Sequence, residues 1–301
     1  TCHRHSYQAV PVFLRRFGAL ANLYRLEYYI YIVTRIWVHK EVISIMSKKF
    51  IACLVLGLFV LTLGLAGCGK KDAAPQQAKV LKVGTEATFA PFEFQDEKSK
   101  EYTGFDMDLI RAIGKQMGYE VEIQNMGFDG LIPALESGQI DVIIAAMTIT
   151  EERAKRVAFS EPYYQSGLTI VVNKDNDKIK TFKDLEGKKI AVQIGTTGAN
   201  EAHKIAGATV REFNSATEAY MELKAGGVDA VLNDRPVNGY YLAQGGNAHA
   251  KEVGEILQAE NYGIAVNKKN AELLNKINQA LAELKKNGEY QKIYEKWFSK
   301  K

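Results

Sequence analysis

Short apolar runs alternate with stretches of helical spacing along most of the chain after residue 80. Apolar residues recur every three or four positions over 106–117 and 271–286, and a second short amphipathic helix is expected within 288–298. Strands are expected at 80–84, 119–123, 141–145, 167–172, 189–192, 208–213, 228–232 and 262–266. Strands that alternate with helices predict an α/β fold, with a mostly parallel sheet covered by helices on both faces.

A different pattern precedes this region. The basic segment 47–49 (Ser-Lys-Lys) follows Met46, and residues 50–65 then form an apolar run of 16 residues, which is the order of a secretory signal. Because a helix needs about 20 residues to cross a bilayer, this run is too short for a membrane anchor. The run leads into 65–68 (Leu-Ala-Gly-Cys), which resembles the bacterial lipobox.

The lipobox-like segment predicts how the mature protein is held. We expect 46–67 to be a lipoprotein signal peptide, Cys68 to carry a diacylglyceryl group and an added acyl chain such as palmitate, and 68–79 to be a flexible tether. Two acyl chains are enough for stable attachment. The predicted location is the cell membrane, lipid-anchored and facing the extracytoplasmic side, either the periplasm or the outer face. An ordinary signal with an incidental cysteine is the alternative.

Residues 1–45 show no secretory pattern, and we expect them to be an upstream translated segment outside the fold, with the start at Met46. A genuine extension is the alternative. The first 67 residues also account for the net charge of +4, since 68–301 contain 31 lysines and arginines against 33 aspartates and glutamates. This balance predicts no nucleic-acid partner.

Six motifs together are highly specific, although each is weak alone. They are Val83–Phe94, Gly104–Leu109, Gly130–Leu135, Met147–Arg153, Phe159–Tyr164 and Gly288–Phe298. In this order and spacing they resemble the amino-acid-binding members of the bacterial extracellular solute-binding proteins, family 3, over about residues 80–299. The resemblance implies a periplasmic-binding-protein-like fold of two α/β lobes joined by two crossover strands (type II). It implies a free amino acid as ligand and the permease and ATPase of an ABC importer as partners.

The same resemblance implies lobe boundaries and a closing motion. Lobe 1 is expected at 80–164 plus 263–301 and lobe 2 at 165–262, with crossovers near 163–167 and 261–263. Because the expected ligand contacts divide between the lobes, the ligand favours a closed state through a hinge motion. The resemblance implies no cofactor, no metal and no catalysis.

A zwitterionic ligand needs a cation for its carboxylate and an anion for its ammonium group. Arg153 follows Thr150, which can cap a helix, and its guanidinium fork matches a carboxylate bidentately. Asp234 directly follows an expected strand, at the edge where ligands of open α/β sheets bind. The alternatives are a solvated helix-face charge for the arginine and a helix cap for the aspartate.

The resemblance adds the remaining contacts. It implies that backbone N–H groups of Thr148 and Thr197 complete the carboxylate site, and that the Ala146 carbonyl and the Thr148 hydroxyl assist Asp234. Phe89 and Phe128 match the aromatic residues on either side of the ligand side chain. A purely structural core role is the alternative for both rings.

Three departures from the glutamine-binding pattern bear on which amino acid is bound. Glu86 stands where that pattern has Asp, Gln193 where it has Lys, and Asn233 where it has His. Losing a cation while keeping a carboxylate makes the distal pocket more negative, and a buried carboxylate needs a positive partner. We therefore expect arginine or lysine first and histidine next, with a glutamine-specific protein as the alternative.

An enzyme on the same fold, similar to cyclohexadienyl dehydratases, is a further alternative, because a fold alone does not define a function. No Ser-His or Cys-His pair is evident, and His203 and His249 lie in polar contexts. A carboxylate general acid such as Glu86 remains open at this point. A sensor input domain is the weaker competitor.

Overall fold

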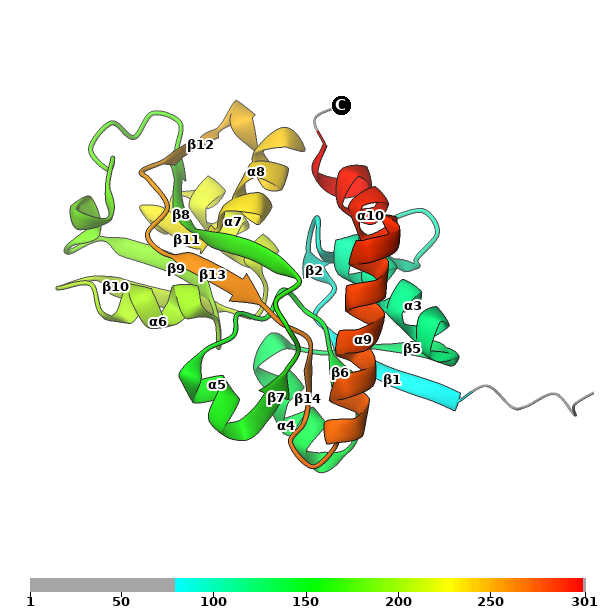
Figure 1. Cartoon of the computed structure of the whole chain (residues 1–301). Helices are drawn as coiled ribbons and strands as arrows, with labels where there is room; N and C mark the ends of the chain where they lie inside the picture. The colour runs from blue at the N-terminus through cyan, green and yellow to red at the C-terminus, as the bar shows by residue number, and fades with distance from the viewer. Residues whose placement is uncertain (1–78, 300–301) are drawn as a thin grey trace, which may run out of the picture. The chain divides into compact units, whose positions relative to one another are not determined.

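The computed structural model describes residues 79–299, which form two helix-covered sheets (Figure 1). The expected upstream segment, signal peptide and lipid attachment at Cys68, and the tether up to residue 78, lie outside the described residues. No helix within 79–299 is long and apolar enough to cross a membrane.

The first sheet has five strands in the order β5-β1-β6-β14-β7. The strands are β1 (Lys79–Thr85), β5 (Tyr119–Asn125), β6 (Val142–Ile143), β7 (Val157–Phe159) and β14 (Ala265–Asn267). β1 runs parallel to β5 and β6, whereas β14 runs antiparallel to β6 and β7. Leu81 and Val83 face a core formed with α3 (Phe105–Met117) and α9 (Ala271–Asn287), and Ile143 and Ala145 face α4 (Phe128–Ser137). Both faces of the sheet are therefore buried.

The second sheet has the order β10-β9-β11-β8-β12, and a further strand, β13, pairs with β8. The strands are β8 (Tyr164–Asn173), β9 (Lys189–Gln193), β10 (Thr209–Phe213), β11 (Ala230–Asp234), β12 (Ala250–Val253) and β13 (Ala259–Tyr262). Ile170 and Val192 pack with α6 (Thr197–His203), whereas Val171 and Val231 pack with α7 (Ala216–Ala225). Consecutive residues of a strand point to opposite faces, so helices cover both sides here as well.

Smaller elements complete the chain. They are the three-stranded sheet β2-β3-β4 (Thr88–Phe89, Glu93–Gln95, Tyr102–Thr103), the helices α5 (Glu151–Arg156), α8 (Arg235–Ala243) and α10 (Glu289–Phe298), and the short helices η1 (Phe182–Leu185) and η2 (Gly246–Ala248).

Two paired strands connect the lobes, as expected. β13 lies antiparallel to β8, with Tyr262 opposite Tyr164 and Ala259 opposite Gly167 (Figure 1). Beyond this pair, β8 continues into the second sheet, while the chain after β13 enters β14 of the first. The exact residues that bound the lobes stay a prediction.

Two expectations about strands were wrong. The sheets are mixed rather than mostly parallel, because the returning segments β8, β12 and β14 are antiparallel to their neighbours. The single strand expected at 262–266 is two strands, β13 and β14, which belong to different sheets. The break falls at Gly263, where an added Cβ would lie 2.8 Å from the Ile149 side chain, so the chain passes between the lobes through a tight contact.

Candidate functional site

Nine residues that the sequence singled out as ligand contacts line one cavity. They are Glu86, Phe89, Phe128, Ala146, Thr148, Arg153, Gln193, Thr197 and Asp234. Glu93, Ala145 and Thr196 also line it. The structure therefore brings together residues that are separated by up to about 150 positions in the sequence.

The strand ends explain this convergence. Glu86 follows β1, and Ala146 and Thr148 lie in the loop after β6, so these residues come from the carboxyl ends of parallel strands in the first sheet. Gln193 ends β9 and Asp234 ends β11, which are parallel neighbours in the second sheet. Loops at the carboxyl ends of parallel strands form the ligand crevice of open α/β sheets.

Arg153 connects the two lobes through its guanidinium. The Thr150 hydroxyl caps α5 by accepting from the Arg153 backbone N–H at 3.2 Å, as the sequence predicts. The side chain donates to the Thr148 carbonyl at 2.7 Å and to the Gly195 carbonyl at 2.9 Å, and it lies 5.2 Å from the centroid of the Phe128 ring. Burial lowers the Arg153 pKa, but a guanidinium stays charged at neutral pH. The cavity thus contains a fixed cation beside an aromatic wall.

Asp234 is buried and directed at the cavity. It occupies the position before α8 but makes no capping hydrogen bond within the described chain, which answers the alternative of a helix cap. Its carboxylate accepts from the Ser166 hydroxyl at 3.1 Å and from the Tyr262 hydroxyl. Burial first, and the charge of Glu260 second, raise the Asp234 pKa to about 8.

Glu86 and Gln193 meet across the two lobes. The Gln193 amide donates to one Glu86 carboxylate oxygen at 3.1 Å, and the Thr88 hydroxyl donates to the other at 2.7 Å. Burial raises the Glu86 pKa, and these two hydrogen bonds oppose that rise. The carboxylate is therefore partly satisfied by neutral donors, without a cation from residues 79–299 to neutralise it.

The other predicted contact residues, Thr148, Ala146 and Thr197, already make hydrogen bonds or begin a helix within the protein. The Thr148 hydroxyl donates to Glu260 at 3.1 Å, and the Thr148 carbonyl accepts from Arg153. Ala146 has a φ of 44°, which is uncommon for a residue with a Cβ, and its N–H donates to Asp106 at 2.8 Å. Such strain concentrates at ligand sites. Thr197 begins α6, whose cap is the Thr196 hydroxyl.

The structure also shows residues that sequence reasoning missed. Glu93 is 1 % exposed, lines the cavity and interacts with Asp106, and burial raises the pKa of both carboxyl groups. Glu260 is 2 % exposed and lies on the crossover strand β13. Glu93 lies within a quoted motif, but no local pattern distinguishes a buried acid from an exposed one. Asn233, considered for specificity, donates instead to Tyr220 at 3.1 Å and does not line the cavity.

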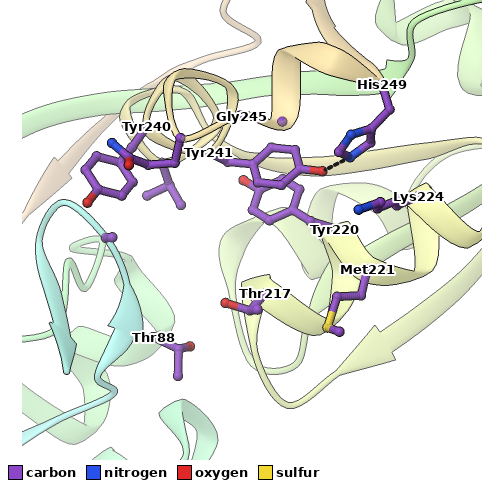
Figure 2. Close-up of a pocket in the computed structure, with 13 residues that line it drawn as sticks. Thr88, Thr217, Tyr220, Met221, Lys224, Tyr240, Tyr241, Gly245 and His249 are labelled. Carbon is purple, nitrogen blue, oxygen red and sulfur yellow. Dashed lines mark hydrogen bonds between the residues drawn. The ribbon is translucent and has the colours of Figure 1, made fainter. Parts of the chain in front are cut away.

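A larger hollow of about 420 Å³ lies elsewhere, between the β2 segment and helices α7 and α8 (Figure 2). Tyr220 and Tyr241 stack there with centroids 4.0 Å apart, and the Tyr241 hydroxyl lies 2.7 Å from His249 Nε2. The described residues that line it include no carboxylate, so it lacks the anion that an amino acid requires. We assign the site by its chemistry to the smaller cavity.

No group of three or more metal-binding side chains occurs within the described residues. The cavity contains one cation and three carboxyl groups together with two aromatic rings, which suits a small zwitterion.

Comparisons with known proteins place this geometry in a family. Residues 81–300 match the model of "Bacterial extracellular solute-binding proteins, family 3". The chain belongs to this family. As a solute-binding protein it is a receptor for a ligand and not an enzyme, which answers the dehydratase alternative.

Individual relatives support the same family assignment. This solute-binding protein is 33 % identical over 264 residues to the arginine-binding extracellular protein ArtP of Bacillus subtilis, covering 84 % of this chain and 98 % of that one. It is 55 % identical to an ancestral arginine-binding protein solved with arginine, with a TM-score of 0.71 and coverage of 73 % and 98 %. An ancestral arginine-binding protein solved with glutamine matches with the same values. The predicted two-lobed α/β fold is thereby confirmed.

Proposed function

We propose that this solute-binding protein, a polar-amino-acid receptor of an ABC importer, binds a basic amino acid, with arginine or lysine preferred and histidine next. The observation that carries this proposal is the charge of the cavity. Arg153 and Asp234 match the two charges of a zwitterion, which leaves Glu86 as a buried carboxylate in the cavity lining without a cationic partner among the described residues. A ligand with a second positive charge supplies that partner, whereas a neutral side chain does not.

In the proposed complex, the protein binds the backbone end of the ligand with charged groups from both lobes. Arg153 contacts the α-carboxylate together with the backbone N–H groups of Thr148 and Thr197. Asp234 accepts from the α-ammonium group, assisted by the Ala146 carbonyl and the Thr148 hydroxyl. These contacts involve atoms that every amino acid has, so they supply affinity rather than selectivity.

The opposite end of the cavity decides which side chain fits. Phe89 and Phe128 would lie against the aliphatic part of the ligand, and Glu86 would accept from its guanidinium or ammonium. Gln193 would orient Glu86 through the hydrogen bond that crosses between the lobes. Arginine can donate in a planar fork to a carboxylate, which favours it over histidine.

Glutamine is the second candidate, because of a specific observation. Gln193 and Thr88 already donate to Glu86, so this carboxylate is not wholly dependent on a cationic ligand. A neutral amide could therefore bind at some cost. The related ancestral protein solved with glutamine supports keeping this alternative.

We further propose that lobes 80–164 plus 263–301 and 165–262 close on the ligand by a hinge at the β8–β13 pair. Arg153 and Glu86 already contact Gly195 and Gln193 of the other lobe. A ligand that adds contacts to both lobes favours the closed state, which the permease would then receive.

Calorimetric titration of the domain tests the specificity. We expect arginine to bind at least about tenfold more tightly than glutamine, and Glu86→Gln to remove most of this difference. Losing a hydrogen bond to a charged group costs about 2 kcal/mol, or about thirtyfold. The matched control is Glu97→Gln, an exposed position, which should leave both affinities unchanged. Glutamine binding more tightly than arginine would contradict the proposal.

The lipid anchor at Cys68 is also a proposal. Acylation would attach the domain to the outer side of the cell membrane through the 68–79 tether. We expect the wild-type protein to incorporate labelled palmitate and to fractionate with membranes, whereas Cys68→Ser should lose the label and be released. Cys53→Ser, inside the expected signal peptide, is the control that should behave as wild type. A labelled Cys68→Ser protein would exclude this attachment site.

A further inference from the structure

Asp234, which lines the cavity, and Glu260 behind it are two buried carboxyl groups. Both are almost fully buried, with 6 % and 2 % exposure, and they come from β11 and from the crossover strand β13. The two side chains flank Ser166: Asp234 accepts from its hydroxyl at 3.1 Å, and Glu260 lies opposite it in the pairing of β13 with β8. Burial and then the charge of Glu260 raise the Asp234 pKa, because two neighbouring acids away from water are ionised together only when a cation joins them.

No basic side chain of the described residues pairs with either acid. Arg153 interacts electrostatically with both acids, yet its guanidinium donates to the carbonyls of Thr148 and Gly195. One oxygen of Glu260 accepts from the Thr148 hydroxyl, and the other, Oε1, is buried without a partner in residues 79–299. The pair therefore has an unfilled capacity to accept hydrogen bonds.

We propose that Glu260 is a positioning residue of the amino-acid site: its carboxylate keeps Asp234 protonated in the empty protein, and the ligand's ammonium group displaces that proton. This inference rests on the proposed function, because it takes Asp234 as the partner of the ammonium. The proton leaves to solvent, and the N–H donors of the ligand replace the O–H of Asp234. Glu260 thus adds negative charge to a subsite that has Asp234 as its direct contact.

Other groups around Asp234 and Glu260 affect the pH at which Asp234 loses its proton. Those that hydrogen-bond or interact electrostatically with Asp234, Glu260 or Arg153 are Glu93, Thr148, Glu152, Tyr164, Ser166, Tyr220 and Tyr262. The Ser166 and Tyr262 hydroxyls favour the ionised form of Asp234, whereas burial and Glu260 oppose it. The balance raises the Asp234 pKa to about 8.

Affinity for the ligand should rise with pH. Below about pH 8 Asp234 carries a proton in the empty site, and binding must release it. The affinity therefore rises by up to about tenfold per pH unit in this range. Above this range the proton is already absent and the rise stops. Arginine is the suitable probe, because its guanidinium stays charged over this range. Its α-ammonium group, which has a carboxylate and not an amide as neighbour, loses its proton only above about pH 8.

The experiment measures arginine affinity from pH 6 to 8, and the heat of binding in two buffers that differ in ionisation enthalpy. Wild-type protein should release close to one proton per arginine at pH 7. Glu260→Gln keeps an acceptor for Thr148 but removes the charge, so affinity should level off at least about one pH unit earlier. Ser166→Ala removes a donor from Asp234 and should shift the curve to higher pH.

Glu255→Gln is the matched control, since it removes one exposed glutamate from the same segment of the chain, and its curve should equal that of wild type. Flat wild-type affinity between pH 6 and 8, or an E260Q curve identical to wild type, would overturn the inference. If E260Q does not fold, two measurements still test the inference. They are the number of protons that wild-type protein releases per arginine and the shift of the S166A affinity curve to higher pH. Absence of binding to every amino acid would instead overturn the proposed function.

Discussion

Replacing Asp234 with asparagine is expected to weaken amino-acid binding by at least about thirtyfold. The side chain keeps its shape but loses the charge that would meet the ligand's ammonium group in a buried site, and removing one member of such a pair costs about 2–5 kcal/mol. Because the ammonium is common to all amino acids, affinities for arginine, lysine, histidine and glutamine should fall by similar factors. Calorimetric titration with each ligand measures this.

The uniform loss distinguishes Asp234 from Glu86, whose replacement should affect basic ligands most. Asp177→Asn is the control, since Asp177 has an 87 % exposed side chain paired only with Lys251 on the surface. Unchanged affinity in the Asp234 variant would remove this residue from the binding site, and a loss confined to arginine would assign it to the side-chain subsite instead.

Arg153→Lys is the second variant with a large expected effect, a loss of about 2–3 kcal/mol, or about thirty- to 150-fold in affinity. Lysine keeps the charge, but it cannot donate in a fork to a carboxylate, nor can it reproduce both carbonyl contacts, to Thr148 and Gly195. Titration with arginine and with its methyl ester, which lacks the carboxylate charge, separates the contributions. The wild-type protein should discriminate strongly between the two ligands, and the variant should discriminate weakly.

A nearby arginine provides the matched control. Arg156 is in the same helix, but it has a 47 % exposed side chain that pairs with Glu136 at the surface. Arg156→Lys should therefore bind arginine as wild type does, because an exposed ion pair contributes about 1 kcal/mol or less. Equal behaviour of the Arg153 and Arg156 variants would contradict a role for Arg153 in binding the ligand carboxylate.

The local sequence pattern predicts best those elements whose formation depends on their own residues. The helices at 106–117 and 271–286 appear with nearly the predicted bounds, because one apolar stripe specifies a helix whatever it packs against. Thr150 caps α5 as predicted, since a capping bond spans only three residues. The prediction of a single strand at 262–266 was wrong. Pairing partners, and not local spacing, determine that β13 and β14 belong to different sheets.

Predictions about the candidate site were likewise correct for some residues and incomplete for others. The sequence identified nine of the twelve residues that line the cavity, but it could not show that Gln193 and Thr88 already donate to Glu86. Nor could it find Glu93, which is one charged residue in a short strand with an otherwise ordinary alternation. Whether such an acid points to solvent or to a cavity depends on elements far along the chain.

The order and types of the residues specify the α/β class, the family and the charged residues Arg153 and Asp234 that line the cavity. Which carboxyl groups lie close together depends on the assembled fold. Asp234 and Glu260 come together because β8 pairs with both β11 and β13. Desolvation then depends on how completely distant segments exclude water, and that packing is a property of the assembled fold.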